Sequence, residues 1–216
     1  MRIFFQIATW LFMPILMPVY ALLLVMYTPS QPFNLSEENS LFIFSNQNKV
    51  AILSNYILFT VIAPIAMYSI FLKLNIIKTI QLDDKKERNM PMILMAIFCF
   101  LLFYTFNSIQ VVLPKYVYGL CLAGGIIITL FSILNSYFKI SLHATGVGIL
   151  TGFVFAYISQ QLFFQLWILI FVLLVSGIVL SSRLYLNKHN SIELISGYFL
   201  SFIITFTINL YYPFLK

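Results

Sequence analysis

Charge is scarce in this sequence. Only 8% of its 216 residues are Asp, Glu, Lys or Arg, and six of those are acidic. A soluble protein carries about 25% charged residues, which it needs to cover its surface. Hydrophobic residues make up 62% of the chain instead. The composition excludes an ordinary soluble domain and predicts one integral membrane domain over residues 1–216.

Residue types that bind metals or carry redox chemistry are equally rare. Cys99 and Cys121 are the two cysteines, and both lie inside apolar runs, which favours buried hydrophobic roles. The two histidines are His143 and His189. The sequence shows no Cys/His cluster, paired carboxylates, glycine-rich phosphate loop or nucleic-acid-binding patch. We therefore expect no metal, no cofactor and no nucleic-acid partner.

Long apolar runs dominate the chain. A helix needs about 20 apolar residues to cross the hydrocarbon layer of a membrane. A shorter run, Ala144–Ile158, contains glycines that permit close packing, so we count it as a buried seventh span. The sequence thus predicts an all-α bundle of about seven transmembrane helices. The first apolar run is expected to be a membrane span and not a cleavable signal peptide. The six longer runs are Ile3–Tyr27, Val50–Leu72, Met92–Val112, Tyr116–Phe138, Leu162–Leu180 and Ile192–Tyr212.

Three polar connections are expected on one face of the membrane. They are Lys85–Pro91, Lys139–His143 and Ser181–Ser191, and two predicted spans separate each from the next. Both histidines fall in these connections. We therefore expect the two imidazoles to meet near one membrane surface, where ionisable groups usually have a function.

The polar residues near these histidines suit phosphoryl transfer without a metal. Guanidinium groups such as those of Arg183 and Arg88 match the geometry of phosphate oxygens. One neutral imidazole can attack phosphorus, while a second protonates the leaving oxygen and later activates water. A carboxylate beside the nucleophile, such as that of Glu193, fixes the tautomer of the ring.

Two of these segments carry a family resemblance. Ser182 to His189 forms an SRxxxxxH pattern, and Glu193 follows four residues later. This segment resembles the third signature, SRxxxxxHxxxD, of the type 2 phosphatidic acid phosphatase superfamily. The segment Ser141-Leu142-His143 resembles the end of the second signature, PSGH, although Leu142 stands in place of the glycine. The resemblance covers about residues 85–212 and implies a six-helix core with Met92–Phe138 as an extra hairpin.

The resemblance implies a role for each catalytic residue. His189 corresponds to the nucleophile, His143 to the general acid, and Glu193 to the aspartate that orients the nucleophile. The implied activity is a metal-independent lipid phosphate phosphatase that acts through a phosphohistidine on a phospholipid or a polyprenyl (di)phosphate. The alternative is a degenerate relative that binds anionic lipid or a membrane partner without catalysis.

The phosphate-binding residues are matched less closely. The resemblance implies phosphate binding by Arg183 and Ser141. The first signature, KxxxxxxRP, has only a loose counterpart in Arg88, with Lys85 as a candidate for its lysine. Simpler interpretations stay open, because Arg183 can be an interfacial charge, Ser141 a helix cap, and His143 a polar residue at a helix start.

Charge also predicts the orientation. Nine Lys and Arg fall on the histidine face against three on the other, so the positive-inside rule places this face in the cytoplasm. The expected location is a cell membrane, and the resemblance favours a bacterial inner membrane.

Overall fold

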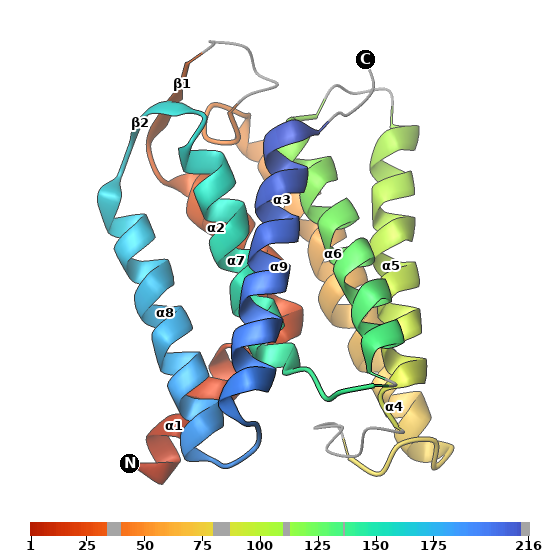
Figure 1. Cartoon of the computed structure of the whole chain (residues 1–216). Helices are drawn as coiled ribbons and strands as arrows, with labels where there is room; N and C mark the ends of the chain where they lie inside the picture. The colour runs from red at the N-terminus through yellow and green to blue at the C-terminus, as the bar shows by residue number, and fades with distance from the viewer. Residues whose placement is uncertain (34–39, 80–86, 110–112, 136, 213–216) are drawn as a thin grey trace.

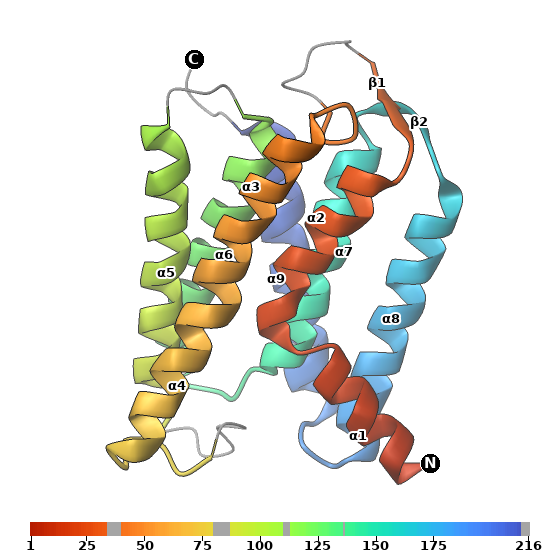
Figure 2. The same cartoon turned by 180° about the vertical axis from the view of Figure 1, so that it is seen from behind.

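The chain folds as a bundle of upright helices, shown from two sides in Figures 1 and 2. The computed structural model describes residues 1–33, 40–79, 87–109, 113–135 and 137–212. The helices are α1 (Arg2–Leu11), α2 (Met17–Tyr27), α3 (Asn46–Ile57), α4 (Ala63–Lys73), α5 (Asn89–Ser108), α6 (Lys115–Leu134), α7 (Leu142–Ile158), α8 (Leu166–Tyr185) and α9 (Ser191–Tyr211). The helical bundle expected from the sequence is thus present.

Among the described residues, five helices are long and apolar enough to cross a membrane. The bent pair α1 and α2 makes a sixth if it is counted as one span. The helix α7 has only 17 residues, so the expected seven spans are not confirmed. At a rise of about 1.5 Å per residue, α7 is about 25 Å long, which is shorter than a typical hydrocarbon layer.

Proline interrupts the N-terminal span. The chain leaves α1 after Leu11, passes through a 3₁₀ turn at Pro14–Leu16 and continues as α2, with a bend of 41°. Proline has no N–H for the helical ladder, and its ring clashes with the preceding turn. The result is that α1 lies across the lower end of the bundle while α2 stands upright within it (Figure 2).

The next span is continuous but contains a wider turn. The helices α3 and α4 are joined by a π-helical segment, Leu58–Ile62, into one apolar helix of 28 residues. Pro64 lies two residues after the end of this segment. A π turn accommodates a residue that cannot donate to the regular ladder, and such turns often lie beside functional sites.

The short helix α7 forms the centre of the bundle. It packs against α9, α8 and α2, and its residues 144–154 are all buried. A Cβ atom on Gly148 would lie 2.5 Å from the carbonyl oxygen of Tyr198, and one on Gly152 would lie 2.5 Å from that of Phe202. These two glycines therefore let the α7 and α9 backbones approach closely, as the sequence predicted for this run.

The α5–α6 hairpin is part of the same core. Its two helices lie side by side in both views, and α6 also packs against α9. A Cβ atom on Gly119 of α6 would meet the side chain of Asn209 at 2.5 Å, so the contact with α9 is close. The hairpin expected as an extra element is thus built into the bundle.

One short β ribbon was not predicted. Strand β1 (Ser30–Pro32) pairs antiparallel with β2 (Gln161–Phe164). The following helix α8 therefore begins at Leu166, four residues after the start of the predicted run at Leu162. The ribbon joins segments 130 residues apart by three or four residues each, too short to give a strand signal.

The polar connections lie at one end of the bundle. Figure 1 shows the α4 end, the α5 start, the α6–α7 connection and the α8–α9 turn together at the lower end, with the ribbon at the other end. The prediction that the three connections share a face is confirmed for their described parts. Residues 85 and 86 lie outside the described residues.

Candidate functional site

Both imidazoles of the chain line one cavity of about 400 Å³. The guanidinium groups of Arg88 and Arg183 line it as well. These four residues come from the α5 start, the α7 start, the α8 end and the α8–α9 turn, which meet at the lower end of the bundle. The structure thus brings His143, His189, Arg183 and Arg88 together as the sequence predicted.

The α8–α9 turn presents His189 to the cavity. Asn187 has a φ of 52°, a left-handed conformation that asparagine tolerates at a helix end. The N–H of Lys188 donates to the carbonyl of Arg183 at 3.1 Å, which closes the Schellman turn after α8. The five residues between Arg183 and His189 are therefore the end of α8 and the turn that follows it.

Glu193 holds the ring of His189. The distance from His189 Nδ1 to Glu193 Oε2 is 2.6 Å. Asn190, the N-cap of α9, accepts from the Glu193 N–H at 2.9 Å and donates to Glu193 Oε1 at 3.3 Å. This reciprocal arrangement at the helix start fixes the carboxylate. The carboxylate accepts, so the proton lies on Nδ1 of the neutral ring and Nε2 carries the lone pair.

The environment keeps this ring neutral. The His189 side chain is only 3% exposed. Burial, together with the nearby charges of Arg183 and Lys139, lowers the pKa of His189 to about 4, although the hydrogen bond to Glu193 acts in the opposite direction. A neutral imidazole is the nucleophilic form.

His143 is held differently, by the first helix of the chain. It is the second residue of α7, and its Nε2 lies 3.2 Å from the carbonyl oxygen of Thr9 in α1. A carbonyl only accepts, so Nε2 carries a proton in this contact. The sequence did not predict this partner, which is 134 residues away.

Ser141 is not among the residues that line the cavity, where a bound phosphate would lie. Its side chain is fully buried, and its hydroxyl accepts from the Ala144 N–H at 3.4 Å as the N-cap of α7. Its own N–H donates to the carbonyl of Glu193 at 3.4 Å. The structure therefore supports the helix-cap interpretation of Ser141 over the phosphate-binding one.

Arg88 is buried at the start of α5. Its Nη1 donates to the carbonyl of Ile140 at 3.1 Å, which ties α5 to the α6–α7 connection. Arg88 also lines the cavity beside both histidines. Lys85, the candidate lysine of the first signature, lies outside the described residues.

Other polar residues at the site were missed by sequence reasoning. Thr9, Trp10 and Tyr68 line the cavity, and the charge of Lys139 acts on His189. Hydroxyl groups within apolar spans were the available signal for Thr9 and Tyr68. Lys139 lies two residues before Ser141, so its position in the polar connection was an equally direct signal.

The rest of the cavity is an apolar slot between spans. Its walls include Pro14, Phe59, Met92, Cys99 and Ile128. Cys99 lies ten residues into α5, so the slot reaches about 15 Å from the start of that helix. Such a shape, with charge at one end and apolar walls beyond, fits a phosphate joined to a hydrocarbon chain.

Within the described parts of the chain, no group of three His, Cys, Asp or Glu side chains is arranged to hold a metal ion. Comparisons with family models, curated proteins and solved structures found no match to the chain.

Proposed function

We propose that the protein is a lipid phosphate phosphatase that works without a metal and forms a phosphohistidine on His189. The observation that carries the proposal is the cavity shared by two imidazoles and two guanidinium groups, with a carboxylate 2.6 Å from one imidazole. The apolar slot beyond these groups supports a lipid substrate. The SRxxxxxH pattern with Glu193 supports a divergent member of the type 2 phosphatidic acid phosphatase superfamily.

The proposed first step is attack by Nε2 of His189 on phosphorus. The N–P bond forms while the bond from phosphorus to the lipid oxygen breaks. His143, protonated beside the negative phosphate, gives its proton to the leaving lipid oxygen. The phosphorylated ring of His189 is positive, and the carboxylate of Glu193 stabilises that charge through Nδ1.

The second step releases phosphate. Neutral His143 takes a proton from water as the water attacks phosphorus, and the N–P bond breaks with its electrons returning to Nε2. Arg183 and Arg88 bind the phosphate oxygens and neutralise the charge spread over them in both steps. Both histidines are then back in their starting states.

We place the site at the cytoplasmic face of a cell membrane, in a bacterium the inner membrane. Arg2, Lys73, Lys78 and Arg183 lie in or next to elements at the histidine end. Lys49 lies in the first turn of α3 and Lys115 is the first residue of α6, both at the other end. This charge asymmetry supports the orientation through the positive-inside rule.

Phosphate release with EDTA present tests the proposal. Purified protein is assayed on phosphatidic acid, phosphatidylglycerol phosphate and polyprenyl phosphates carrying labelled phosphate. We expect release by the wild type and an alkali-stable, acid-labile label on the protein, both absent from His189→Ala. Equal release by the wild type and His189→Ala would refute the mechanism.

A second candidate is a relative that binds anionic lipid without turnover. The burial of the Ser141 hydroxyl in a helix cap favours it, because one expected phosphate ligand is thereby engaged elsewhere. Retained binding of orthovanadate, lost in Arg183→Gln, together with no release from any of these lipids, would select this candidate.

A further inference from the structure

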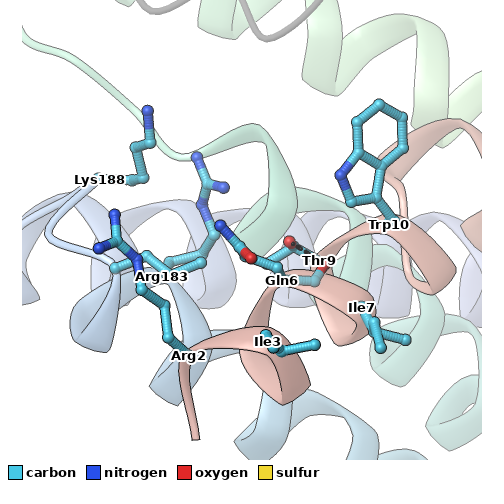
Figure 3. A pocket seen from close by; sticks show the side chains of 9 residues that line it. Arg2, Ile3, Gln6, Ile7, Thr9, Trp10, Arg183 and Lys188 are labelled. Atoms are coloured by element: carbon cyan, nitrogen blue, oxygen red, sulfur yellow. Dashed lines mark hydrogen bonds between the residues drawn. The ribbon is translucent and has the colours of Figure 1, made fainter.

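A second cavity, of about 530 Å³, adjoins the histidine cavity. Thr9, Trp10 and Arg183 line both cavities, so the two spaces meet at these residues. The walls of the second cavity are α1 on one side and the end of α8 with its following turn on the other (Figure 3). The proposed reaction uses none of the groups that line this cavity alone.

Helix α1 turns a polar stripe towards this cavity. Arg2, Gln6 and Thr9 are spaced four and three residues apart, which places them on one face of a helix, and all three line the cavity. Phe4 and Leu11 are exposed on the same helix. Ile3, Ile7 and Trp10 of α1 line the cavity beside this polar stripe.

Packing holds α1 in this position. The ring of Phe5 lies 4.6 Å from that of Tyr185 at the end of α8, measured between centroids. The carbonyl of Thr9 accepts from His143. The second cavity is therefore built by the same contacts that place the general acid.

The charge around the second cavity has one sign. Arg2, Arg183 and Lys188 line it, and none of its described lining residues is acidic. In Figure 3 the side chains of these three residues gather on one side of the pocket, with Gln6 beside Arg183. Cations and an amide donor around a cavity suit a phosphate group.

We propose that this cavity is a second phosphate subsite and that the substrate is a lipid whose head carries a second phosphate beyond the one that reacts. This inference rests on the proposed function, because it places the reacting phosphate beside His189. Arg183 lies between the two spaces, so two phosphates joined directly or by a short linker share it. Arg2, Gln6 and Lys188 then bind the second phosphate.

Binding to the His189→Ala protein tests the subsite without turnover. The probes are farnesyl phosphate, farnesyl diphosphate, inorganic phosphate and methylenediphosphonate, titrated by calorimetry in detergent. We expect farnesyl diphosphate to bind about tenfold more tightly than farnesyl phosphate, since one additional charge-assisted contact corresponds to about that factor. The preference should weaken with added salt, because the subsite lies near the surface.

Two further variants locate the preference. Lys188→Gln removes one cation, and Gln6→Glu puts a negative charge into the cavity with almost no change of shape. Lys73→Gln is the matched control, because Lys73 is an exposed cation at the same end that does not line either cavity. We expect the first two changes to abolish the preference and the control to keep it.

The probes also separate the sources of the second phosphate. A preference for farnesyl diphosphate alone supports a subsite for the lipid head, and an equal preference for methylenediphosphonate over phosphate supports a subsite for free anions as well. Equal binding of the one-phosphate and two-phosphate probes overturns the proposal even if the wild type hydrolyses lipid phosphates. If the preference is present but no lipid is hydrolysed, the subsite stands and the proposed function fails.

Discussion

The α8–α9 turn and the start of α7 each supply one histidine to the cavity, but different groups hold the two rings. In the first, a carboxylate lies 2.6 Å from His189 and is itself fixed by the α9 N-cap. In the second, His143 contacts a backbone carbonyl of α1, which is neutral. The α8–α9 turn is also assembled from neighbouring residues. The position of His143 instead depends on α1, which is far away in the sequence.

This difference supports the roles that we propose for the two rings. A carboxylate stabilises the positive charge that a ring gains when it binds phosphorus, whereas a carbonyl orients a proton without adding charge. The ring beside the carboxylate is therefore suited to nucleophilic attack, and the ring beside the carbonyl to proton transfer. Replacement of the two histidines should therefore impair different steps of the reaction.

The largest predicted effect separates these two failures. His189→Asn should lose at least about 1,000-fold in kcat/KM on a lipid phosphate and on p-nitrophenyl phosphate alike, because no covalent intermediate forms. His143→Asn should lose about 100-fold on the lipid, whose alkoxide needs a proton, but should still release p-nitrophenolate, which leaves without one. Stopped-flow absorbance would measure the release.

The initial burst of p-nitrophenolate release provides the control for this comparison. With p-nitrophenyl phosphate, His143→Asn should release one equivalent of p-nitrophenolate quickly and then slow down, because water attacks the phosphohistidine without a base. Labelled phosphate should accumulate on the protein. Equal losses by both variants on both substrates would remove the distinction between the two histidines.

The α8–α9 turn was predictable from sequence because all its parts are local. Arg183, His189 and Glu193 lie within eleven residues, and a helix end, a tight turn and a helix start are enough to bring them together. The spans were predictable for a similar reason, since each apolar run carries its own signal. The ends of α5, α6 and α9 lie within a few residues of the predicted ones.

What could not be predicted depends on distant contacts. The carbonyl of Thr9 carries no sequence signal, and only packing of α1 against α8 brings it to His143. The ribbon between β1 and β2 could not be predicted either, because strands of three and four residues have no periodicity to detect. Ser141 was ambiguous from sequence because a hydroxyl before a helix serves equally as a cap or a ligand.

A smaller effect is predicted for the carboxylate of the α8–α9 turn. Glu193→Gln keeps the shape of the side chain but removes the charge that stabilises the phosphorylated ring, so kcat should fall about tenfold to 100-fold. This loss should be smaller than that of His189→Asn. A measured kcat equal to that of the wild type would show that Glu193 has only a structural role.

The pH profile distinguishes these roles further. With p-nitrophenyl phosphate, whose leaving group needs no proton from His143, the kcat/KM of the wild type should stay level as pH falls from 7. It should decline only near the lowered pKa of His189, about 4, below which the ring is protonated and cannot attack. The hydrogen bond that His189 donates to Glu193 raises that pKa, so Glu193→Gln should move the decline to still lower pH. A decline near pH 6.5 in both proteins would contradict the burial of His189.

The smallest predicted effect concerns the α6–α7 connection. Ser141→Ala removes the N-cap of α7 and should lower the free energy of unfolding by about 1 kcal/mol, while Ser141→Asp should retain most of it because aspartate also caps helices. The transition would be followed by thermal unfolding in detergent, with Ser196→Ala in the first turns of α9 as a control for a hydroxyl that caps no helix.

Because the Ser141 hydroxyl faces Ala144 and not the cavity, kcat/KM of Ser141→Ala should change less than about threefold. This is far below the factor of about 100 that loss of a charge-assisted phosphate ligand produces. A large fall in kcat/KM with unchanged stability would instead make Ser141 a phosphate ligand, and the α6–α7 connection would then resemble the family signature more closely than its cap geometry indicates.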